Sequence, residues 1–325
     1  MSFTKLIAIL LVPGLGATFI FALVLVWLER KLAALVQHRY GPLRVSPVEG
    51  ILQPIADFIK LLISEIIIPE ESHKILFISL PIMFDLVALL AVAFIPAAST
   101  LYIARSSISL IIILFLLMLA STIIAVMGWV ASDKFTYVGA VREVLQSLAA
   151  EIPLILSFTS VILLTRTLDI YRIVLYQRTL PLALLNPLAF IVFIICALMA
   201  TSRFPFEVPE AETEIVFGPY TEYSGALFAL SFLGVYVKIY VYSMLASCLF
   251  LGGWYGPFSN MGTIPQIFWT YLKASIIATL MVLTRAAYPR IRIDQVLRIG
   301  LGTLTLMGAA ACALSLLLSL LGLPH

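Results

Sequence analysis

Charged side chains are scarce in this sequence of 325 residues: they make up 11% of it, whereas hydrophobic residues make up 62%. Soluble domains carry about a quarter charged residues, and one soluble core is too small to bury so much apolar surface. The scarcity therefore excludes an ordinary soluble protein. The formal net charge of +3 is also too small to indicate nucleic-acid binding. A bilayer accommodates such a chain, which has room for about eight spans of about 20 residues.

Cysteine is scarce as well. The three cysteines, Cys196, Cys248 and Cys312, lie in apolar runs, without CxxC spacing and without a nearby histidine. This pattern excludes a disulfide framework and a cysteine-based metal centre, and it favours a packing role. The chain thus has no ligand set for iron–sulfur clusters, haem or flavin, and we expect no cofactor to be bound by this chain alone.

Long apolar runs, in contrast, are abundant. The first run is too long for the core of a signal peptide and lacks a small-residue cleavage pattern, so we expect a retained span. No repeat or low-complexity linker divides the chain, which favours a single all-α membrane domain over residues 1–325. Transmembrane helices are predicted at 6–28, 75–97, 107–130, 142–165, 183–202, 224–251, 264–284 and 298–322.

Most of the 20 basic residues lie in alternate connections, and this placement orients the chain. By the positive-inside tendency these loops are cytoplasmic, and both termini are expected on the outer side. The last of these loops is short and basic, which suits phospholipid headgroups or an acidic partner equally well. The predicted cytoplasmic loops cover residues 29–74, 131–142, 203–223 and 285–298.

The first cytoplasmic loop, 29–74, contains a helical pattern over residues 51–66. Apolar residues recur on one side, while Gln53, Asp57 and Lys60 share the other. The pattern predicts an amphipathic helix that lies in the membrane interface or under a partner. A lipid-surface anchor is the alternative, and the sequence leaves both open.

The loop 203–223 concentrates acids. After Arg203 come four carboxylates within eight residues, at positions 207, 210, 212 and 214. Such neighbours repel one another, which raises some of their pKa values. A solvated acidic loop is the ordinary interpretation. Because this run is flanked by spans in a chain with only 17 acids, we favour a functional role.

Ionisable residues also enter the predicted spans. Glu143, Ser147 and Glu151 are spaced i, i+4, i+8 and form a single polar stripe on the fourth span. Asp85 and Lys238 are isolated in other spans. Because ionisable groups in a span are costly and tend to mark ion paths, these residues predict a proton path; Lys238 suits simple pairing with a carboxylate equally well.

Six motifs at the span ends and in the loops run in order over nearly the whole chain: Glu29-Arg30-Lys31, Gln37-His38-Arg39-Tyr40-Gly41-Pro42, Gln53-Pro54-Ile55-Ala56-Asp57, Lys60-Leu61-Leu62, Pro205-Phe206-Glu207-Val208-Pro209-Glu210-Ala211-Glu212 and Thr221-Glu222-Tyr223-Ser224-Gly225. Together they resemble the H-type (subunit 1) membrane subunit of respiratory complex I, and of related membrane-bound hydrogenase and sulfur-reducing complexes.

The resemblance implies a prokaryotic plasma-membrane subunit, without a self-contained active site, that forms much of a quinone chamber and couples electron transfer to proton pumping. It implies partners: peripheral-arm iron–sulfur and large (hydrogenase-like) subunits, antiporter-like and small membrane subunits, and lipid. The implied chamber residues are Arg30, Arg39, Asp57, Lys60, Arg203, Glu207, Glu210, Glu212 and Glu214. The proton-path candidates are Glu143, Glu151, Asp85 and Lys238.

The sequence departs from the family pattern at functional positions. Ala200 and Val235 stand where the family usually has glutamate, whereas Glu143 stands where small residues are usual and Lys238 follows Val235 by one turn. These changes predict a rerouted proton path. Two other functions remain open: the coupling subunit of a hydrogenase or sulfur-reducing complex without quinone reduction, and a self-sufficient secondary transporter, which predicts an inverted repeat that the sequence does not show.

Overall fold

Helices make up the regular structure of the chain. The computed structural model describes residues 9–45 and 49–321, and no strand occurs among them. A π-helical turn, Arg298–Leu304, joins the last two helices. In order, the helices are α2 (Leu15–Val36), α3 (Gln53–Ile63), α4 (Lys74–Val92), α5 (Ser109–Val130), α6 (Lys134–Thr165), α7 (Ile170–Tyr176), α8 (Leu182–Leu185), α9 (Pro187–Ala200), α10 (Glu212–Ile215), α11 (Gly225–Phe250), α12 (Thr263–Ala287), α13 (Ile293–Leu297) and α14 (Thr305–Leu320).

In the described part of the chain, six helices are long and apolar enough to cross a membrane: α4, α5, α6, α11, α12 and the continuous Ile293–Leu320. The predicted all-α integral membrane fold is therefore confirmed. Helix α9 is apolar but shorter, and α2 carries Glu29, Arg30 and Lys31 in its second half. Each predicted run overlaps a helix, while the total of eight spans stays a prediction.

Two predicted boundaries are wrong. Helix α2 does not end at residue 28 but continues to Val36, so the Glu29-Arg30-Lys31 motif is helical. Helix α6 begins at Lys134 rather than at residue 142, because the Asp133 carboxylate accepts hydrogen bonds from the backbone N–H groups of Phe135 (2.8 Å) and Thr136 (3.4 Å) and caps the helix. Much of the expected loop 131–142 is therefore part of α6.

Two parts of the sequence-based predictions lie outside the described residues. The first predicted span starts at residue 6, and residues 1–8 are not described. The expected side of the two termini accordingly stays a prediction. The described chain also omits residues 46–48, which follow the Gly41-Pro42 turn.

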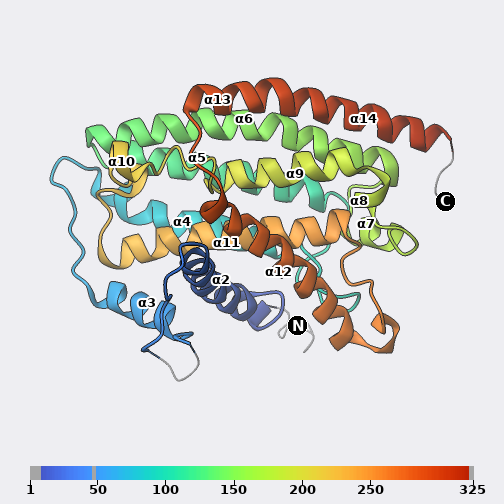
Figure 1. Cartoon of the computed structure of the whole chain (residues 1–325), viewed down its shortest axis with the longest axis horizontal. Helices are drawn as coiled ribbons and strands as arrows, with labels where there is room; N and C mark the ends of the chain where they lie inside the picture. Colours follow the sequence, from blue (N-terminus) through green and yellow to red (C-terminus); the bar gives the residue numbers. More distant parts are fainter. Residues whose placement is uncertain (1–8, 46–48, 322–325) are drawn as a thin grey trace.

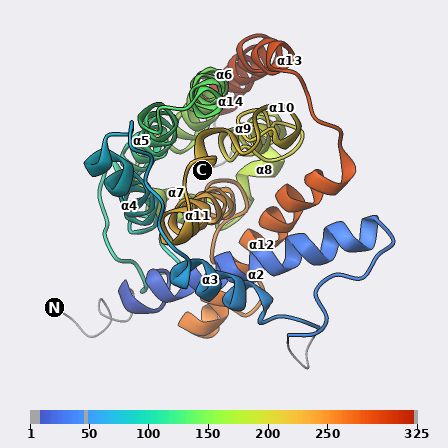
Figure 2. The ribbon, with the colours of Figure 1, turned by 90° about the vertical axis from the view of Figure 1, so that its left-hand side faces the viewer.

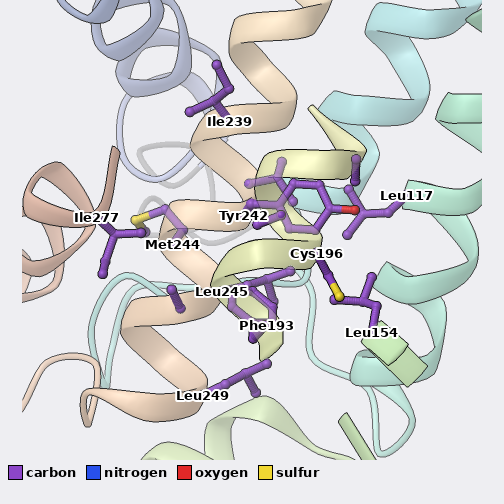
Figure 3. Close-up of a cluster of buried hydrophobic side chains, with 14 of the residues drawn as sticks. Leu117, Leu154, Phe193, Cys196, Ile239, Tyr242, Met244, Leu245, Leu249 and Ile277 are labelled. Carbon is purple, nitrogen blue, oxygen red and sulfur yellow. The ribbon is translucent and has the colours of Figure 1, made fainter. Parts of the chain in front are cut away.

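Helix α11 occupies the centre of the bundle. Viewed along the helices (Figure 2), it is surrounded by α4, α5, α6 and α9 on one side and by α2 and α12 on the other. Its second half, from Gly234 to Phe250, is buried at every residue. An apolar cluster packs there around Phe193 and Tyr242 and includes Cys196 (Figure 3), so this cysteine does pack in the core.

One end of the bundle gathers the polar connections. The short helices α3 and α10 and the start of α6 all lie at the left of Figure 1, and we refer to this side as the α3–α10 end. Helix α2 crosses the bundle there and packs against α3, α11 and α12. The corner between these four helices holds the candidate site.

Candidate functional site

Two adjoining cavities lie in the corner formed by α2, α3 and α11. The polar cavity has a volume of about 630 Å³, and the apolar cavity has a volume of about 250 Å³. They share four wall residues, so they lie against each other. The shared residues are Val26, Arg30, Phe232 and Tyr236.

The two cavities differ sharply in chemistry. Four charged side chains line the polar cavity, together with the turn that follows α2. Mainly aliphatic and phenylalanine side chains line the apolar cavity. The polar cavity is lined by Val26, Glu29, Arg30, Ala33, Gln37, Arg39, Tyr40, Gly41, Pro42, Gln53, Phe232, Tyr236 and Arg285. The apolar cavity is lined by Ala22, Leu23, Val26, Arg30, Pro54, Asp57, Phe58, Leu61, Phe217, Phe228, Ala229, Phe232, Leu233 and Tyr236.

The continuation of α2 beyond residue 28 builds the shared wall. Val26, Arg30 and Ala33 recur at helical spacing and therefore lie on one face. Arg30 forms an ion pair with Asp57 of α3, which ties the amphipathic helix to α2. Gln53 supports this pair, since its Nε2 donates to Asp57 Oδ1 at 2.7 Å. The sequence motifs at residues 29–31 and 53–57 thus meet at one point in space.

A buried charge cluster contributes three side chains to the wall of the polar cavity. The carboxylate of Glu29, only 4% exposed, accepts hydrogen bonds from Arg203 Nη1 at 3.0 and 3.1 Å. Arg285 also donates to it, and the hydroxyl of Tyr236 donates at 2.8 Å. The Arg203 guanidinium lies over the Tyr236 ring, 4.6 Å from its centroid. We call these four residues the Glu29 cluster.

The acidic loop contains carboxyl groups in two different electrostatic settings. Burial raises the pKa of Glu207 to about 7, although Arg285 and Arg203 act against it. Burial raises the pKa of Glu210 to about 8, again against the charge of Arg203. Glu214, in contrast, is exposed, and its hydrogen bond from Arg142 (2.6 Å) lowers its pKa. Only the first two therefore titrate near neutral pH.

A buried polar layer continues from this loop into the membrane helices. Glu143 of α6 is 3% exposed, and its Oε2 accepts a hydrogen bond from Ser202 Oγ at 3.2 Å. Gln146 Nε2 donates to the same serine hydroxyl at 3.2 Å and to the carbonyl oxygen of Met199 at 2.7 Å. These bonds join the start of α6 to the end of α9.

Lys238 of α11 is the buried cation of this layer. Its Nζ donates to Ser121 Oγ at 3.0 Å, and its charge acts on Glu143, Glu151 and Glu210. Glu151 follows Glu143 by two helical turns, about 12 Å along the axis at 1.5 Å per residue. A string of interacting ionisable groups therefore runs from the acidic loop into the bundle.

Ala200 and Val235 are both buried apolar residues, 6% and 7% exposed. Ala200 ends α9, two residues before the Ser202 hydroxyl that bonds Glu143. An acid from α6 is thus placed next to the end of α9, close to the position where the family pattern has its own acid.

Comparisons with known proteins agree with the motifs. The family model described as NADH dehydrogenase matches residues 7–316. The chain belongs to this family. A relative from Rickettsia typhi is 40% identical over 281 residues, 85% of this chain and 82% of that protein. One from Dehalococcoides mccartyi (strain CBDB1) is 39% identical over 285 residues, 88% and 79% respectively. One from Syntrophotalea carbinolica is 36% identical over 321 residues, 94% and 96%.

All three relatives are named as the H-type component of NADH-quinone oxidoreductase. The predicted membership of the H-type family is therefore confirmed, and the match extends over nearly the whole chain. It covers every helix bordering the two cavities and the buried polar layer.

The structure sorts the predicted chamber residues of this family member into three groups: those at the cavities or in the Glu29 cluster, the half-buried acids of the loop, and the exposed residues. Arg30, Arg39 and Asp57 line the cavities, and Arg203 belongs to the Glu29 cluster. Glu207 and Glu210 follow Arg203 in the same loop. Lys60, Glu212 and Glu214 are exposed and line neither cavity.

Asp85 lies apart from the other proton-path candidates, in a third cavity between α2, α4 and α11. No metal centre was predicted, and within residues 9–45 and 49–321 no group of three or more His, Cys, Asp or Glu side chains is placed to hold a metal ion.

Three residues of the site were missed as functional candidates. Glu29 was noted only as part of a motif, Tyr236 only as a neighbour of Val235, and Arg285 only as part of a basic loop suited to lipid or a partner. Arg285 instead lies in the last turn of α12 and bonds Glu29. An acid at the end of an otherwise apolar helix was the available signal, because such a group requires a partner.

Proposed function

We propose that this chain is the membrane-arm subunit of a complex I-like oxidoreductase, and that its two adjoining cavities form a quinone chamber. The supporting observation is the match between cavity and ligand. A quinone has a polar ring with two carbonyl oxygens and an apolar tail, and the polar cavity lies against the apolar one across a shared wall. Small-molecule sites typically combine an apolar wall with a few placed polar groups.

The ring would lie in the polar cavity. Arg30 and Arg39 line it and carry N–H donors, and donors of this kind bond carbonyl oxygens. The Glu29 cluster holds Tyr236 and Arg285 in fixed orientations in the cavity wall. The tail would extend past Val26 and Phe232 into the apolar cavity.

Electrons must reach this chamber from other chains. No sequence motif here binds a redox centre, so we place the iron–sulfur clusters on peripheral-arm subunits docked at the α3–α10 end. That end presents the exposed apolar side chains of α3, among them Ile59 and Ile63. The remaining partners would be the large hydrogenase-like subunit, antiporter-like and small membrane subunits, and lipid.

Coupling to proton translocation would be electrostatic. Reduction of quinone takes up protons and changes the charge near the acidic loop, where Glu207 and Glu210 hold pKa values of about 7 and about 8. Glu210 interacts with Glu143, and Lys238 interacts with Glu143 and Glu151. Coupled groups of this kind titrate together, so a change in the loop is passed to α6.

The membrane side follows from the same assignment. Basic residues gather at the α3–α10 end, which we place in the cytoplasm of a prokaryotic cell, with the chain in the plasma membrane and both termini outside. The three relatives named above are all bacterial.

The chamber is tested in the intact complex with two arginine variants from one loop. Arg39 lines the polar cavity, whereas Arg44 does not, although both are exposed. Arg39→Ala should raise the KM for quinone about tenfold, the effect of one charge-assisted hydrogen bond, while Arg44→Ala should leave it within about twofold. Steady-state quinone reduction measures both.

Equal effects in the two variants would contradict the chamber. Extraction of the purified complex provides the second readout. Bound quinone, together with inhibition by quinone-site inhibitors, supports the proposal. Absence of both would instead favour a hydrogenase or sulfur-reducing complex, and ion flux through the isolated chain in liposomes would favour a secondary transporter.

A further inference from the structure

A third cavity lies beside the proposed chamber, and several of its lining side chains, among them Leu15 and Leu86, are exposed. It is formed by α2, α4 and α11 and has a volume of about 370 Å³. This volume lies within the range of about 300–1,000 Å³ that is typical of small-molecule pockets. Its lining is almost entirely aliphatic, and Leu233 lines both this cavity and the apolar cavity of the chamber. We call it the Asp85 cavity, after the one acid among the described residues that line it.

The carboxyl group of Asp85 has no partner there. The residue is 7% exposed, and neither of its oxygens forms a hydrogen bond with any residue that the structure describes. Gly234 of α11 makes room for it, because a Cβ at that position would lie 2.6 Å from Asp85 Oδ1 and 2.4 Å from the Phe84 ring. The packing therefore accommodates a polar group without satisfying it.

The unpaired carboxyl group and the apolar lining together determine which kind of ligand the cavity suits. An unpaired ionised carboxylate is costly in an apolar membrane interior, so the neutral acid, with one O–H donor, is the cheaper form. Thr18 lines the same cavity, but its hydroxyl already donates to the Gly14 carbonyl oxygen at 2.8 Å. The free donor is therefore the Asp85 O–H, and it suits a hydrogen-bond acceptor on an apolar, uncharged molecule.

We infer that the Asp85 cavity is a membrane-side binding site for the carbonyl group of a quinone, next to the chamber and separate from it. This inference rests on the proposed quinone chamber. Because Leu233 lines both cavities, a quinone in the chamber would be the carbonyl-bearing molecule nearest to the Asp85 cavity. It replaces the proton-carrying role expected of Asp85 from the sequence. Asp85 donates a hydrogen bond here and does not need to titrate.

Protection from chemical labelling tests occupancy directly in the wild-type complex. Dicyclohexylcarbodiimide is lipid-soluble and reacts with a neutral carboxyl: the acid proton moves to one carbodiimide nitrogen while the carboxyl oxygen bonds the central carbon. Mass spectrometry of the α4 peptide reads the label. Decylubiquinone at about ten times its Kd should slow labelling of Asp85 about tenfold, whereas decylbenzene, which lacks carbonyl groups, should not.

Equal protection by decylbenzene, or no protection by decylubiquinone, overturns the inference. The measurement reports binding alone and requires no turnover. Because it does not depend on quinone reduction, it can be repeated in the Arg39→Ala complex, in which quinone binding in the chamber is weakened. Persisting protection there identifies a separate site even if the chamber fails its own test, and loss of protection in that variant overturns the separation of the two sites.

Two substitutions distinguish hydrogen bonding from titration. Asp85→Asn keeps an N–H donor of similar size but cannot carry a proton, whereas Asp85→Leu removes the donor. Asp85→Leu should raise the KM for decylubiquinone about 3–10-fold, the effect of one hydrogen bond, and Asp85→Asn should stay within about twofold of wild type. The inference is overturned in favour of a proton carrier if both variants lose proton pumping to the same extent and the KM is unchanged in both. If neither variant assembles, the labelling result decides.

Discussion

Two sets of carboxylates at the α3–α10 end, one fully buried and one half-buried, behave in opposite ways. Glu29 receives hydrogen bonds from Arg203, Arg285 and Tyr236. Glu207 and Glu210 are half-buried, and within the described residues neither forms an ion pair. Burial with partners keeps a carboxylate charged and fixed, while burial without them raises its pKa to about 7 and about 8 in this loop.

The two sets therefore differ in role: the paired carboxylate holds structural elements together, whereas the unpaired carboxyl groups can exchange protons. The Glu29 cluster ties α2, α11, α12 and the acidic loop together, and it holds the wall of the polar cavity. The unpaired acids hold protons near neutral pH and interact with the polar layer of α6. Changes to the first set should affect assembly, and changes to the second set should affect turnover.

The largest effect is expected from Glu29→Gln. This change leaves two guanidinium groups, one of them the buried Arg203, without their counterion, and breaking a buried ion pair typically costs about 3–5 kcal/mol. The yield and thermal unfolding of the purified complex measure the loss. The control is Glu214→Gln, an exposed acid paired with Arg142 and Arg290, which should cost at most about 1 kcal/mol. Comparable losses in both variants would contradict the distinction.

A smaller structural but large functional effect is expected from Glu151→Gln. The amide has nearly the same shape, so the complex should assemble, but it cannot carry a proton, and proton translocation should fall about 100-fold or more. Ser147→Ala, one turn earlier on the same stripe, is the control and should pump normally. Proton uptake per electron in proteoliposomes is the measurement. Normal pumping by an assembled Glu151→Gln complex would exclude Glu151 from the path.

The smallest effect is expected from Glu210→Gln and concerns only pH. Because both loop acids have raised pKa values, they keep their protons to higher pH than ordinary glutamates and lose them as the pH rises through about 7 and about 8. If turnover needs these protons, kcat should fall in two steps as the pH rises. Glu210→Gln should remove the upper step and leave the lower one.

Steady-state kcat between about pH 6 and pH 9 resolves the two steps as apparent values of a coupled pair. Glu212→Gln alters an exposed acid of the same loop and is the matched control, whose profile should be unchanged. A Glu210→Gln profile identical to wild type would contradict a working role for this acid.

Much of the fold was predictable because apolar runs of span length have few alternatives in a chain with so little charge. Helix ends were less predictable. The start of α6 depends on the Asp133 cap, and a single capping side chain is easily overlooked in a polar stretch. The extension of α2 depends on distant partners, since Glu29 lies in its buried part and is neutralised by Arg203 and Arg285.

The site was predictable in its motifs but not in its contacts. The motifs at residues 29–31 and 53–57 contribute cavity-lining side chains, yet nothing in their spacing shows that Arg30 pairs with Asp57. Lys60 and Glu212 share motifs with residues that line the cavities or lie buried, but they face solvent. A shared motif indicates that the residues descend from a common family pattern. Whether each side chain is buried depends on which neighbouring helix covers it.

Apolar run length and motif order are local properties, and they are enough to identify a helical membrane protein of the NADH dehydrogenase family. The pairing of the acids, in contrast, depends on how the helices pack. Arg203 and Arg285 meet Glu29 across 174 and 256 residues of chain, a closeness that no local pattern encodes. The scarce charges therefore acquire their roles from packing: with partners a buried acid is a structural link, and without them it is free to exchange a proton or bind a ligand.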